Sequence, residues 1–337
     1  MTSHVAFLFP GQGSQTVGMG ADVFATSPAA RNVFETVDEA LGFSLSTLCF
    51  HGPEETLRET INAQPAIVTV SLALLAAFQD ALSPGSSSWS SPLVPDYTAG
   101  HSVGEYAALV VTGALELASA ARLVRERGRL MHHEGTVCPG GMAAIIGMDE
   151  TTLQEICQEA TSESSAQNAP DAHPGMGRVI IANLNAPGQI VISGEDHALQ
   201  LAMEKARARG AKKVIPLAVS GAFHSPVMQP AAAELANVIG TTPVQNATIP
   251  IISNISATPL LEAEAIRNEL STQVESPVQW IRTIEYLNQA GVTTCIEIGP
   301  GQALTGMAKR IAKGMTLINI SNAADIEKAV ARVQEMG

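Results

Sequence analysis

Short apolar runs alternate with helix-like stretches along most of this 337-residue chain. Apolar runs of about four to eight residues, bounded by turn residues, predict buried strands. In this chain they fall at residues 5–9, 96–99, 249–252, 294–298 and 315–320. Strands that alternate with helices predict a mainly parallel sheet with helices on both faces. The longest apolar run, residues 66–78, contains Thr69 and Ser71 and predicts a buried helix rather than a membrane span.

The middle of the chain has a different pattern. Strand-like segments fall at residues 142–147, 179–183, 189–193 and 213–219, with helix-like segments at residues 152–160 and 196–209. The resulting order βαββαβ is typical of a ferredoxin-like unit. We therefore predict an α/β fold with a large α/β-hydrolase-like domain, residues 1–138 and 217–337, and an inserted ferredoxin-like small domain, residues 139–216. Polar stretches at residues 83–95 and 161–178 predict surface loops.

Composition narrows the class of protein. The chain is 46% hydrophobic and 15% charged, as expected of a compact globular enzyme. A net charge of −13 argues against nucleic-acid binding and against adhesion to an anionic membrane. The four cysteines have no metal-type spacing, and the apolar run at the N-terminus is too short for a signal peptide. We expect a cytoplasmic protein without a metal ion or a disulfide framework.

The most informative motif is Gly100-His101-Ser102-Val103-Gly104, which lies between a predicted strand and a predicted helix. In a G-x-S-x-G elbow the sharp turn exposes the serine hydroxyl, and the glycines let the backbone crowd there. The N-terminus of the following helix directs free N–H groups toward negative charge near the serine. Ser102 is therefore a candidate nucleophile, with a chance glycine-serine loop as the alternative.

A serine nucleophile requires a base, and His224 is the best placed of the eight histidines. It follows the last strand of the small domain, in the loop that returns the chain to the large domain, so we expect it to face Ser102 across a cleft. The alternative is a loop histidine without a role. We expect His101 to support the elbow, and His132 and His133 to end a helix. The absence of a suitable orienting acid before His224 disfavours an ordinary esterase triad.

Arg127 is unusual because it lies on the apolar face of a predicted helix, residues 118–132. Arg122, Arg125 and Arg129 share the opposite face. A guanidinium on an apolar face requires a partner, because an unpaired buried charge is very costly. Two interpretations stay open, which are a buried ion pair with a protein carboxylate and a bidentate clamp for a substrate carboxylate.

Gln12 follows the first predicted strand, in Gly11-Gln12-Gly13. Ligands bind at the ends of parallel strands in such sheets. The main-chain N–H of Gln12 is therefore a candidate partner for that of Val103 in an oxyanion hole, with a plain glycine-rich turn as the alternative. The spacing matches neither G-x-G-x-x-G nor a Walker A motif, so we predict no nucleotide site.

Together these segments resemble the malonyl-CoA:acyl carrier protein transacylases, which include stand-alone enzymes and the acyltransferase domains of polyketide synthases. The similarity runs nearly end to end and is carried by an ordered set of motifs. The set comprises Phe9-Pro10-Gly11-Gln12-Gly13-Ser14-Gln15, Gln64-Pro65-Ala66, the elbow, Arg127-Gly128, Asn183-Leu184-Asn185-Ala186-Pro187-Gly188-Gln189, Gly221-Ala222-Phe223-His224-Ser225, Pro277-Val278-Gln279-Trp280 and Glu297-Ile298-Gly299-Pro300-Gly301. Each motif alone is weak, whereas the ordered set is highly specific.

The resemblance implies a ping-pong transfer of a malonyl group from malonyl-CoA to the phosphopantetheine thiol of an acyl carrier protein. Ser102 would form a malonyl ester while His224 takes its proton, and the carrier thiol would then attack that ester. The main-chain carbonyl of Gln273 would orient His224 in place of an acid. The resemblance implies no cofactor, because the phosphopantetheine belongs to the carrier protein.

The same resemblance implies the remaining site residues. The main-chain amides of Gln12 and Val103 would stabilise both tetrahedral intermediates, and Arg127 would bind the free carboxylate of malonate. Phe223 belongs to a motif that looks like the malonyl-selective form and would leave little room for a 2-methyl group. A single methyl group gives only modest selectivity.

Two other functions are kept as alternatives. One is a serine hydrolase of thioesters or esters, which has no need of Arg127, and the other is a non-catalytic docking subunit of a synthase. Carrier proteins are typically acidic, as is this chain, so docking requires a local basic patch. The candidate patch consists of Lys205, Arg207, Arg209, Lys212 and Lys213, with a solvated helix face as the alternative. A monomer is the simplest expectation, and the sequence does not distinguish fatty-acid from polyketide synthesis.

Overall fold

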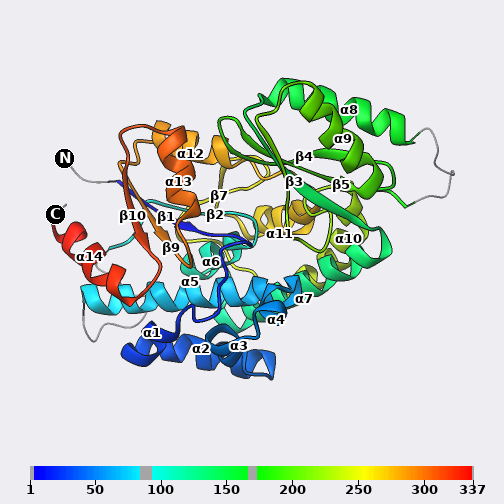
Figure 1. Ribbon diagram of the computed structural model, residues 1–337. Coiled ribbons are helices and arrows are strands. Elements are labelled where there is room, and N and C mark those ends of the chain that lie inside the picture. The colour runs from blue at the N-terminus through cyan, green and yellow to red at the C-terminus, as the bar shows by residue number, and fades with distance from the viewer. Residues whose placement is uncertain (1–3, 84–92, 166–172, 336–337) are drawn as a thin grey trace.

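The computed structural model describes residues 4–83, 93–165 and 173–335, which form two lobes with one β-sheet in each (Figure 1). The larger sheet has the strand order β10-β9-β1-β2-β7-β8. Its strands are β1 (Val5–Phe9), β2 (Tyr97–Gly100), β7 (Ile251–Ile252), β8 (Pro259–Leu260), β9 (Thr294–Ile298) and β10 (Thr316–Ile320). Neighbouring strands are parallel except for β7 and β8, which confirms the predicted mainly parallel sheet.

Helices cover both faces of this sheet. Successive strand residues point to opposite faces, so each face contributes its own apolar side chains to a core. Phe7 and Phe9 of β1 join the largest core, whereas Ala6 and Leu8 join a smaller one. The helices around the largest core are α1 (Ala21–Thr26), α2 (Pro28–Leu41), α3 (Leu45–His51), α4 (Glu54–Arg58), α5 (Thr60–Leu82), α6 (Gly104–Val111), α7 (Leu117–Val137), α10 (Gln229–Thr241), α11 (Ala263–Thr272) and α14 (Ala323–Gln334). The opposite face carries α12 (Trp280–Gln289) and α13 (Ala303–Ile311).

The helix α5 runs through the middle of the large lobe, beneath the sheet in Figure 1. It is long and apolar enough to cross a membrane, yet 94% of that stretch is buried inside the protein. The helices α2, α7 and α14 all pack against it. The apolar run in the sequence therefore belongs to a core helix, as predicted.

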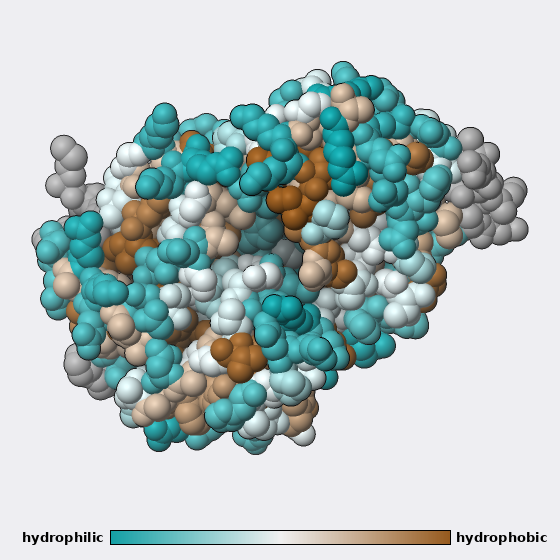
Figure 2. All heavy atoms as spheres, in the orientation of Figure 1, coloured by the Kyte–Doolittle hydropathy of each residue, from teal (hydrophilic) through white to brown (hydrophobic). Residues whose placement is uncertain are grey.

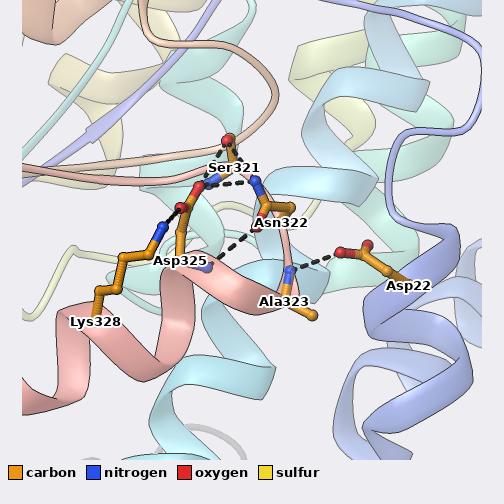
Figure 3. Close-up of polar contacts among 6 residues, drawn as sticks. All are labelled: Asp22, Ser321, Asn322, Ala323, Asp325 and Lys328. Atoms are coloured by element: carbon orange, nitrogen blue, oxygen red, sulfur yellow. Dashed lines mark hydrogen bonds and ion pairs between the residues drawn. The ribbon is translucent and has the colours of Figure 1, made fainter.

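The start of α14 shows how local capping and a distant contact combine (Figure 3). Asn322 caps the helix by accepting a hydrogen bond from the N–H of Asp325 at 3.1 Å. The Asp325 carboxylate in turn accepts from the hydroxyl of Ser321 at 2.9 Å. The N–H of Ala323 donates to Asp22 of α1 at 2.6 Å, which ties the last helix of the chain to the first.

The smaller lobe contains an antiparallel sheet with the strand order β4-β5-β3-β6. Its elements are β3 (Gly140–Ile146), α8 (Glu150–Ser165), β4 (Val179–Ala186), β5 (Gln189–Glu195), α9 (Asp196–Ala208) and β6 (Lys213–Pro216). The order βαββαβ is the predicted ferredoxin-like one. The helices α8 and α9 cover one face, around Ile145, Ile156 and Ile192. Met142 and Val191, on the other face, pack toward the large lobe.

Several predicted boundaries in the smaller lobe were wrong, among them the end of β4, which is Ala186 instead of residue 183. β6 ends at Pro216 instead of residue 219, because proline brings no N–H to the ladder and the chain then turns, with the N–H of Val219 donating to the carbonyl of Leu217. The helix α8 continues to Ser165, so the predicted loop 161–178 begins later. The remaining parts of this loop and of loop 83–95 lie largely outside the described residues. The domain limits 1–138, 139–216 and 217–337 stay a prediction.

The end of α7 also differs from the prediction. His132 and His133 were expected to end the helix, but it runs on to Val137 with both histidines exposed on its surface. The helix instead ends just before Cys138, the residue that precedes Pro139. A residue before proline is disfavoured in helical conformation, which explains the stop.

Candidate active site

The elbow that carries Ser102 is a sharp turn between β2 and α6. Ser102 has a φ of 52°, a left-handed conformation that is rare for residues other than glycine. A Cβ on Gly100 would lie 2.0 Å from the main chain of Gly104, and a Cβ on Gly104 would lie 2.2 Å from the carbonyl oxygen of Phe9. Both glycines are therefore required by the close approach of the backbone, as the motif predicts.

Asn254 holds the elbow from outside. Its Oδ1 accepts a hydrogen bond from the N–H of Ser102 at 2.7 Å, and its Nδ2 donates to the carbonyl of Gly100 at 2.8 Å. Sequence reasoning missed this residue. A signal was available, because Asn254 is a polar residue close after β7, the parallel neighbour of β2, and the ends of such strands meet at one edge.

His224 lies across from the serine in the loop that follows the small lobe. Its Nε2 is 2.7 Å from the Oγ of Ser102. Its Nδ1 lies 3.0 Å from two main-chain carbonyl oxygens, those of Gln273 and Ser276. Since carbonyls only accept, Nδ1 carries the proton and Nε2 is left free to accept one. The position of the Gln273 carbonyl agrees with the role that the resemblance implies, whereas the Ser276 carbonyl was not anticipated.

The surroundings of His224 keep its ring neutral. The side chain is almost completely buried, and burial together with the positive charge of Arg127 lowers its pKa to about 3. A neutral imidazole with an available Nε2 is the form that can take a proton from a hydroxyl. The main-chain N–H of His224 donates to the carbonyl of Val274 at 2.8 Å, so the residues around position 274 hold the loop as well as the ring.

Arg127 is fully buried and points at the serine. Its Nη1 donates to the Oε1 of Gln64 at 2.6 Å, and its Nη2 donates to the Oγ of Ser102 and to the Oε1 of Gln273, each at 3.0 Å. Among the described residues, no carboxylate lies within ion-pair distance of the guanidinium, and its Nε has no hydrogen-bond partner. The interpretation of Arg127 as half of a buried ion pair therefore lacks a partner in that part of the chain.

Gln12 and Val103 line the same cavity as Ser102. The loop after β1 touches the elbow, since a Cβ on Gly11 would lie 2.5 Å from the carbonyl oxygen of His101. Within the described residues, the main-chain N–H groups of Gln12 and Val103 donate to no protein acceptor. Two such amides beside a nucleophile can stabilise the oxyanion of a tetrahedral intermediate.

The cavity around Ser102 has a volume of about 500 Å³ and lies between the two lobes. Figure 2 views the molecule from a side where the surface is hollowed between the lobes. The large lobe contributes Met131 and Phe223 to its lining, and the small lobe contributes Met142 and Val191. Phe223 is buried directly before His224 and lines the cavity at that point.

The histidine of the elbow, His101, supports the structure, in line with the sequence prediction. The Nε2 of His101 lies 2.8 Å from the Oδ1 of Asn185 in β4, and its ring packs on Trp280 with centroids 5.4 Å apart. His101 thus connects the elbow to the smaller lobe. In the described ranges, no group of three or more His, Cys, Asp or Glu residues is arranged to hold a metal ion.

Comparisons with known proteins agree with this arrangement. A family model described as an acyl transferase domain matches residues 6–330. The chain is 43% identical to the malonyl CoA-acyl carrier protein transacylase of Bacillus subtilis, over 99% of this chain and 98% of that protein. It is 39% identical to the protein of the same name from Escherichia coli K12, over 92% of this chain and 94% of that protein.

Solved structures give the same result. An acyl-carrier-protein-S-malonyltransferase from Bartonella henselae superposes with a TM-score of 0.89 at 41% identity, covering 98% of this chain and 99% of that one. A malonyl-transacylase in complex with a type II PKS acyl-carrier protein superposes with a TM-score of 0.87 at 36% identity, covering 98% of this chain and 100% of that one. The similarity therefore extends over the whole chain, both lobes included.

Proposed function

We infer the function of this chain from its family. The chain belongs to the acyl transferase family and, within it, to the malonyl-CoA:acyl carrier protein transacylases. The protein transfers the malonyl group of malonyl-CoA to the phosphopantetheine thiol of an acyl carrier protein. A malonyl ester of Ser102 is the intermediate. We propose that the reaction uses no cofactor of its own, because the phosphopantetheine arrives on the partner.

The first half-reaction loads the serine. The Oγ of Ser102 attacks the thioester carbonyl while the Nε2 of His224 takes the hydroxyl proton. The main-chain amides of Gln12 and Val103 stabilise the oxyanion that forms. When the intermediate collapses, the C–S bond breaks, the imidazolium returns the proton to the leaving sulfur, and coenzyme A departs as the thiol.

The second half-reaction empties the serine. His224 takes the proton of the carrier's phosphopantetheine thiol, and the sulfur attacks the ester carbonyl, again at the two amides. The C–O bond to Ser102 breaks and the serine oxygen recovers the proton from His224. The product is a malonyl thioester on the carrier protein and a free enzyme.

One observation carries the choice of malonyl as the acyl group. Arg127 is a fully buried guanidinium that lies 3.0 Å from the Oγ of Ser102 and has no carboxylate partner among the described residues. A substrate that brings its own carboxylate supplies the missing charge, and a guanidinium binds a carboxylate with two parallel hydrogen bonds. An acetyl group has no such carboxylate, so the same pocket binds it less well.

The test compares loading by malonyl-CoA and acetyl-CoA, followed by intact-mass spectrometry. We expect a long-lived malonyl adduct on the wild-type protein. The Arg127→Ala variant should lose about 100-fold or more in the rate of malonyl loading, as expected for a lost charge-assisted pair, and far less in acetyl loading. Arg122→Ala, on the exposed side of the same helix, is the matched control. An unchanged preference for malonyl in Arg127→Ala would refute the clamp.

The same experiment separates the two alternative functions. Rapid release of free malonate from the wild-type protein would indicate a serine hydrolase. The absence of any adduct would indicate a non-catalytic docking subunit. Phe223→Ala, measured with malonyl-CoA and methylmalonyl-CoA, tests the size limit that we propose for this side chain, and we expect a shift of about 10-fold or less toward the methylated substrate.

The basic patch for the carrier protein requires revision. Lys205 is paired with Glu163 at 2.8 Å and Arg209 with Glu159 at 2.5 Å, both on α8, so these two cations are already neutralised. Lys212 and Lys213 are exposed at the start of β6, whose continuation lines the cavity. We therefore place the docking surface on Lys212 and Lys213 and leave Lys205 and Arg209 out of it. Arg207, exposed at the end of α9, stays a predicted member of the patch.

A second basic segment lies nearby and joins this surface. The helix α13 lines the cavity, and residues 298–324 around it contain Lys309, Arg310 and Lys313 but no acidic residue. The guanidinium of Arg310 donates to the carbonyl of Pro187 in the turn between β4 and β5. An acidic carrier protein that contacts both segments would have its phosphopantetheine at the cavity entrance.

Charge reversal tests this surface. A variant with Lys212→Glu and Lys213→Glu should slow transfer to the carrier protein by about 10-fold at low salt, and should leave loading by malonyl-CoA nearly unchanged. Lys328→Glu, on the distant α14, is the control. Equal effects on both half-reactions would contradict the surface. We further propose that the protein is a cytoplasmic monomer that binds neither nucleic acid nor membranes.

A further inference from the structure

A buried carboxyl group behind the nucleophile has no role in the steps above. Glu105 lies in the first turn of α6, three residues after Ser102, and is only 1% exposed. It does not line the cavity, so substrate does not reach it. Burying a carboxyl group is costly unless its oxygens are hydrogen-bonded, so the contacts of Glu105 indicate what it does.

Gln273 connects this carboxyl group to the active site. The side-chain Nε2 of Gln273 donates to the Oε2 of Glu105, and the side-chain Oε1 accepts from the Nη2 of Arg127 at 3.0 Å. The main-chain oxygen of the same residue lies 3.0 Å from the Nδ1 of His224. A single residue therefore contacts the buried acid, the guanidinium and the base.

The two ends of a side-chain amide are not equivalent, and Glu105 determines which end faces Arg127. A guanidinium has donors only, so it requires the oxygen of the amide. A carboxyl oxygen at Glu105 accepts from the nitrogen and leaves the oxygen for Arg127. The other acceptor near Nε2 is the carbonyl of Ser102, at the longer distance of 3.3 Å. Without Glu105, the side-chain amide of Gln273 would be free to rotate by half a turn. Its N–H groups would then face the N–H groups of Arg127.

A second buried acid provides a comparison. Glu269 accepts from the hydroxyl of Ser253 at 2.6 Å and from the N–H of Ile255 at 3.0 Å, so it holds the turn after β7. Burial, and then the nearby Glu269, raise the pKa of Glu105 well above its ordinary value. A glutamine in its place would keep the shape of the side chain and an acceptor oxygen for the Nε2 of Gln273.

We propose that Glu105 is a positioning residue for substrate selection, because it holds the side chain of Gln273 so that its Oε1 fixes the guanidinium of Arg127. The inference rests on the proposed function of Arg127 as the clamp for the malonyl carboxylate. Removal of the Glu105 side chain frees the Gln273 amide to rotate. The guanidinium then loses one of its two side-chain amide acceptors, and the clamp loses its fixed direction.

The test uses the full chain and measures loading by malonyl-CoA and by acetyl-CoA in wild type, Glu105→Ala, Glu105→Gln and Glu269→Gln, with thermal unfolding of each. Glu105→Ala should lower the malonyl-to-acetyl ratio of kcat/KM by about 10- to 100-fold, mainly through the KM for malonyl-CoA. Glu105→Gln should restore the ratio to within about 3-fold of wild type. Glu269→Gln should lower the Tm without moving the ratio.

The outcomes are separable. A lowered Tm in Glu105→Ala with an unchanged ratio would reduce Glu105 to a structural role and overturn the proposal, as would a ratio in Glu105→Gln that falls as far as in Glu105→Ala. If Glu105→Ala does not fold, Glu105→Met replaces it, because methionine fills the buried space but offers no oxygen to the Nε2 of Gln273, and its ratio should fall likewise. Failure of the clamp itself is distinct, since the ratio would then be insensitive to Arg127→Ala.

Discussion

The serine and its base lie on two turns that are held in place in different ways. The elbow around Ser102 is built from its own neighbours in sequence, with Gly100 and Gly104 permitting contacts that a side chain would block. The loop around His224 is held by a segment about fifty residues further along, residues 273–276, through main-chain hydrogen bonds. Yet both residues have left-handed backbones, with φ values of 52° and 58°.

This difference concerns where backbone strain is compensated. Strained conformations persist at functional sites only when the surrounding structure determines them. At the elbow the compensation comes mainly from a strand, a turn and a helix that follow one another in the chain, with Asn254 as a distant support. At the histidine it comes mainly from long-range contacts. The elbow should therefore fail through local sterics, and the histidine loop through loss of its distant partners.

The largest expected effect comes from removing the two reactive groups themselves. Ser102→Ala and His224→Ala should each lower malonyl transfer by about 10⁴-fold or more, because members of such a pair act as a unit. Ser102→Ala should also lose the malonyl adduct completely in intact-mass spectrometry, whereas His224→Ala keeps the nucleophile and should load slowly. An adduct on Ser102→Ala would place the nucleophile elsewhere.

The next effect tests the local construction of the elbow. In Gly104→Ala the new methyl group would lie 2.2 Å from the carbonyl oxygen of Phe9, a contact with main chain that cannot easily move. We expect a loss of about 3 kcal/mol or more in the free energy of unfolding, measured with urea. Gly306→Ala is the control, because Gly306 lies within α13 with no atom near the new methyl, and it should be neutral or stabilising by up to about 1 kcal/mol. Equal losses in the two variants would contradict the steric account.

The same contrast explains how much the sequence alone could predict. The strands at residues 5–9 and 294–298 and the turn at Ser102 follow from local patterns of apolar residues and glycines, and the structure has them where predicted. The burial of Arg127 also follows, because helical periodicity places it on the apolar face. These features depend on residues that are close together in the chain.

Other features could not be predicted because they depend on distant residues. The hydrogen bonds of Asn254 to the elbow and the Ser276 carbonyl beside His224 arise only when the sheet order brings them together. The role of the Gln273 carbonyl came from the resemblance and not from any local pattern. The link from Gln273 to Glu105 is of the same kind, since it joins side chains 168 positions apart.

A smaller effect concerns pH and tests the buried state of the histidine. The pKa of His224 is lowered from 6.5 to about 3, so between these values the unfolded chain binds a proton that the folded chain does not. This group therefore lowers stability as the pH falls below about 6.5, by about 2 kcal/mol between pH 6.5 and pH 5. Urea unfolding should show this extra loss in wild type but not in His224→Gln. Above pH 7 the free energy of unfolding of the two proteins should change with pH in the same way.

The activity should follow the same pKa. The acid limb of kcat/KM for malonyl loading should lie below pH 5, since the base stays neutral until then. A limb near pH 6.5 would mean that His224 is not buried in the reacting enzyme. In Arg127→Ala the limb should move upward, because the positive charge of Arg127 is the second cause of the lowered pKa.

The smallest effect tests whether the histidine loop is held by main chain alone. Ser276 contributes its carbonyl oxygen to His224, at 3.0 Å from Nδ1, and this oxygen is present whatever the side chain. Ser276→Ala should therefore keep kcat/KM within about 2-fold of wild type, because the main-chain hydrogen bond is unchanged. A loss of 10-fold or more, measured by malonyl loading, would show that the hydroxyl takes part. The histidine loop would then depend on a side chain as well as on its distant main-chain hydrogen bonds, and the account of how this loop is held would fail.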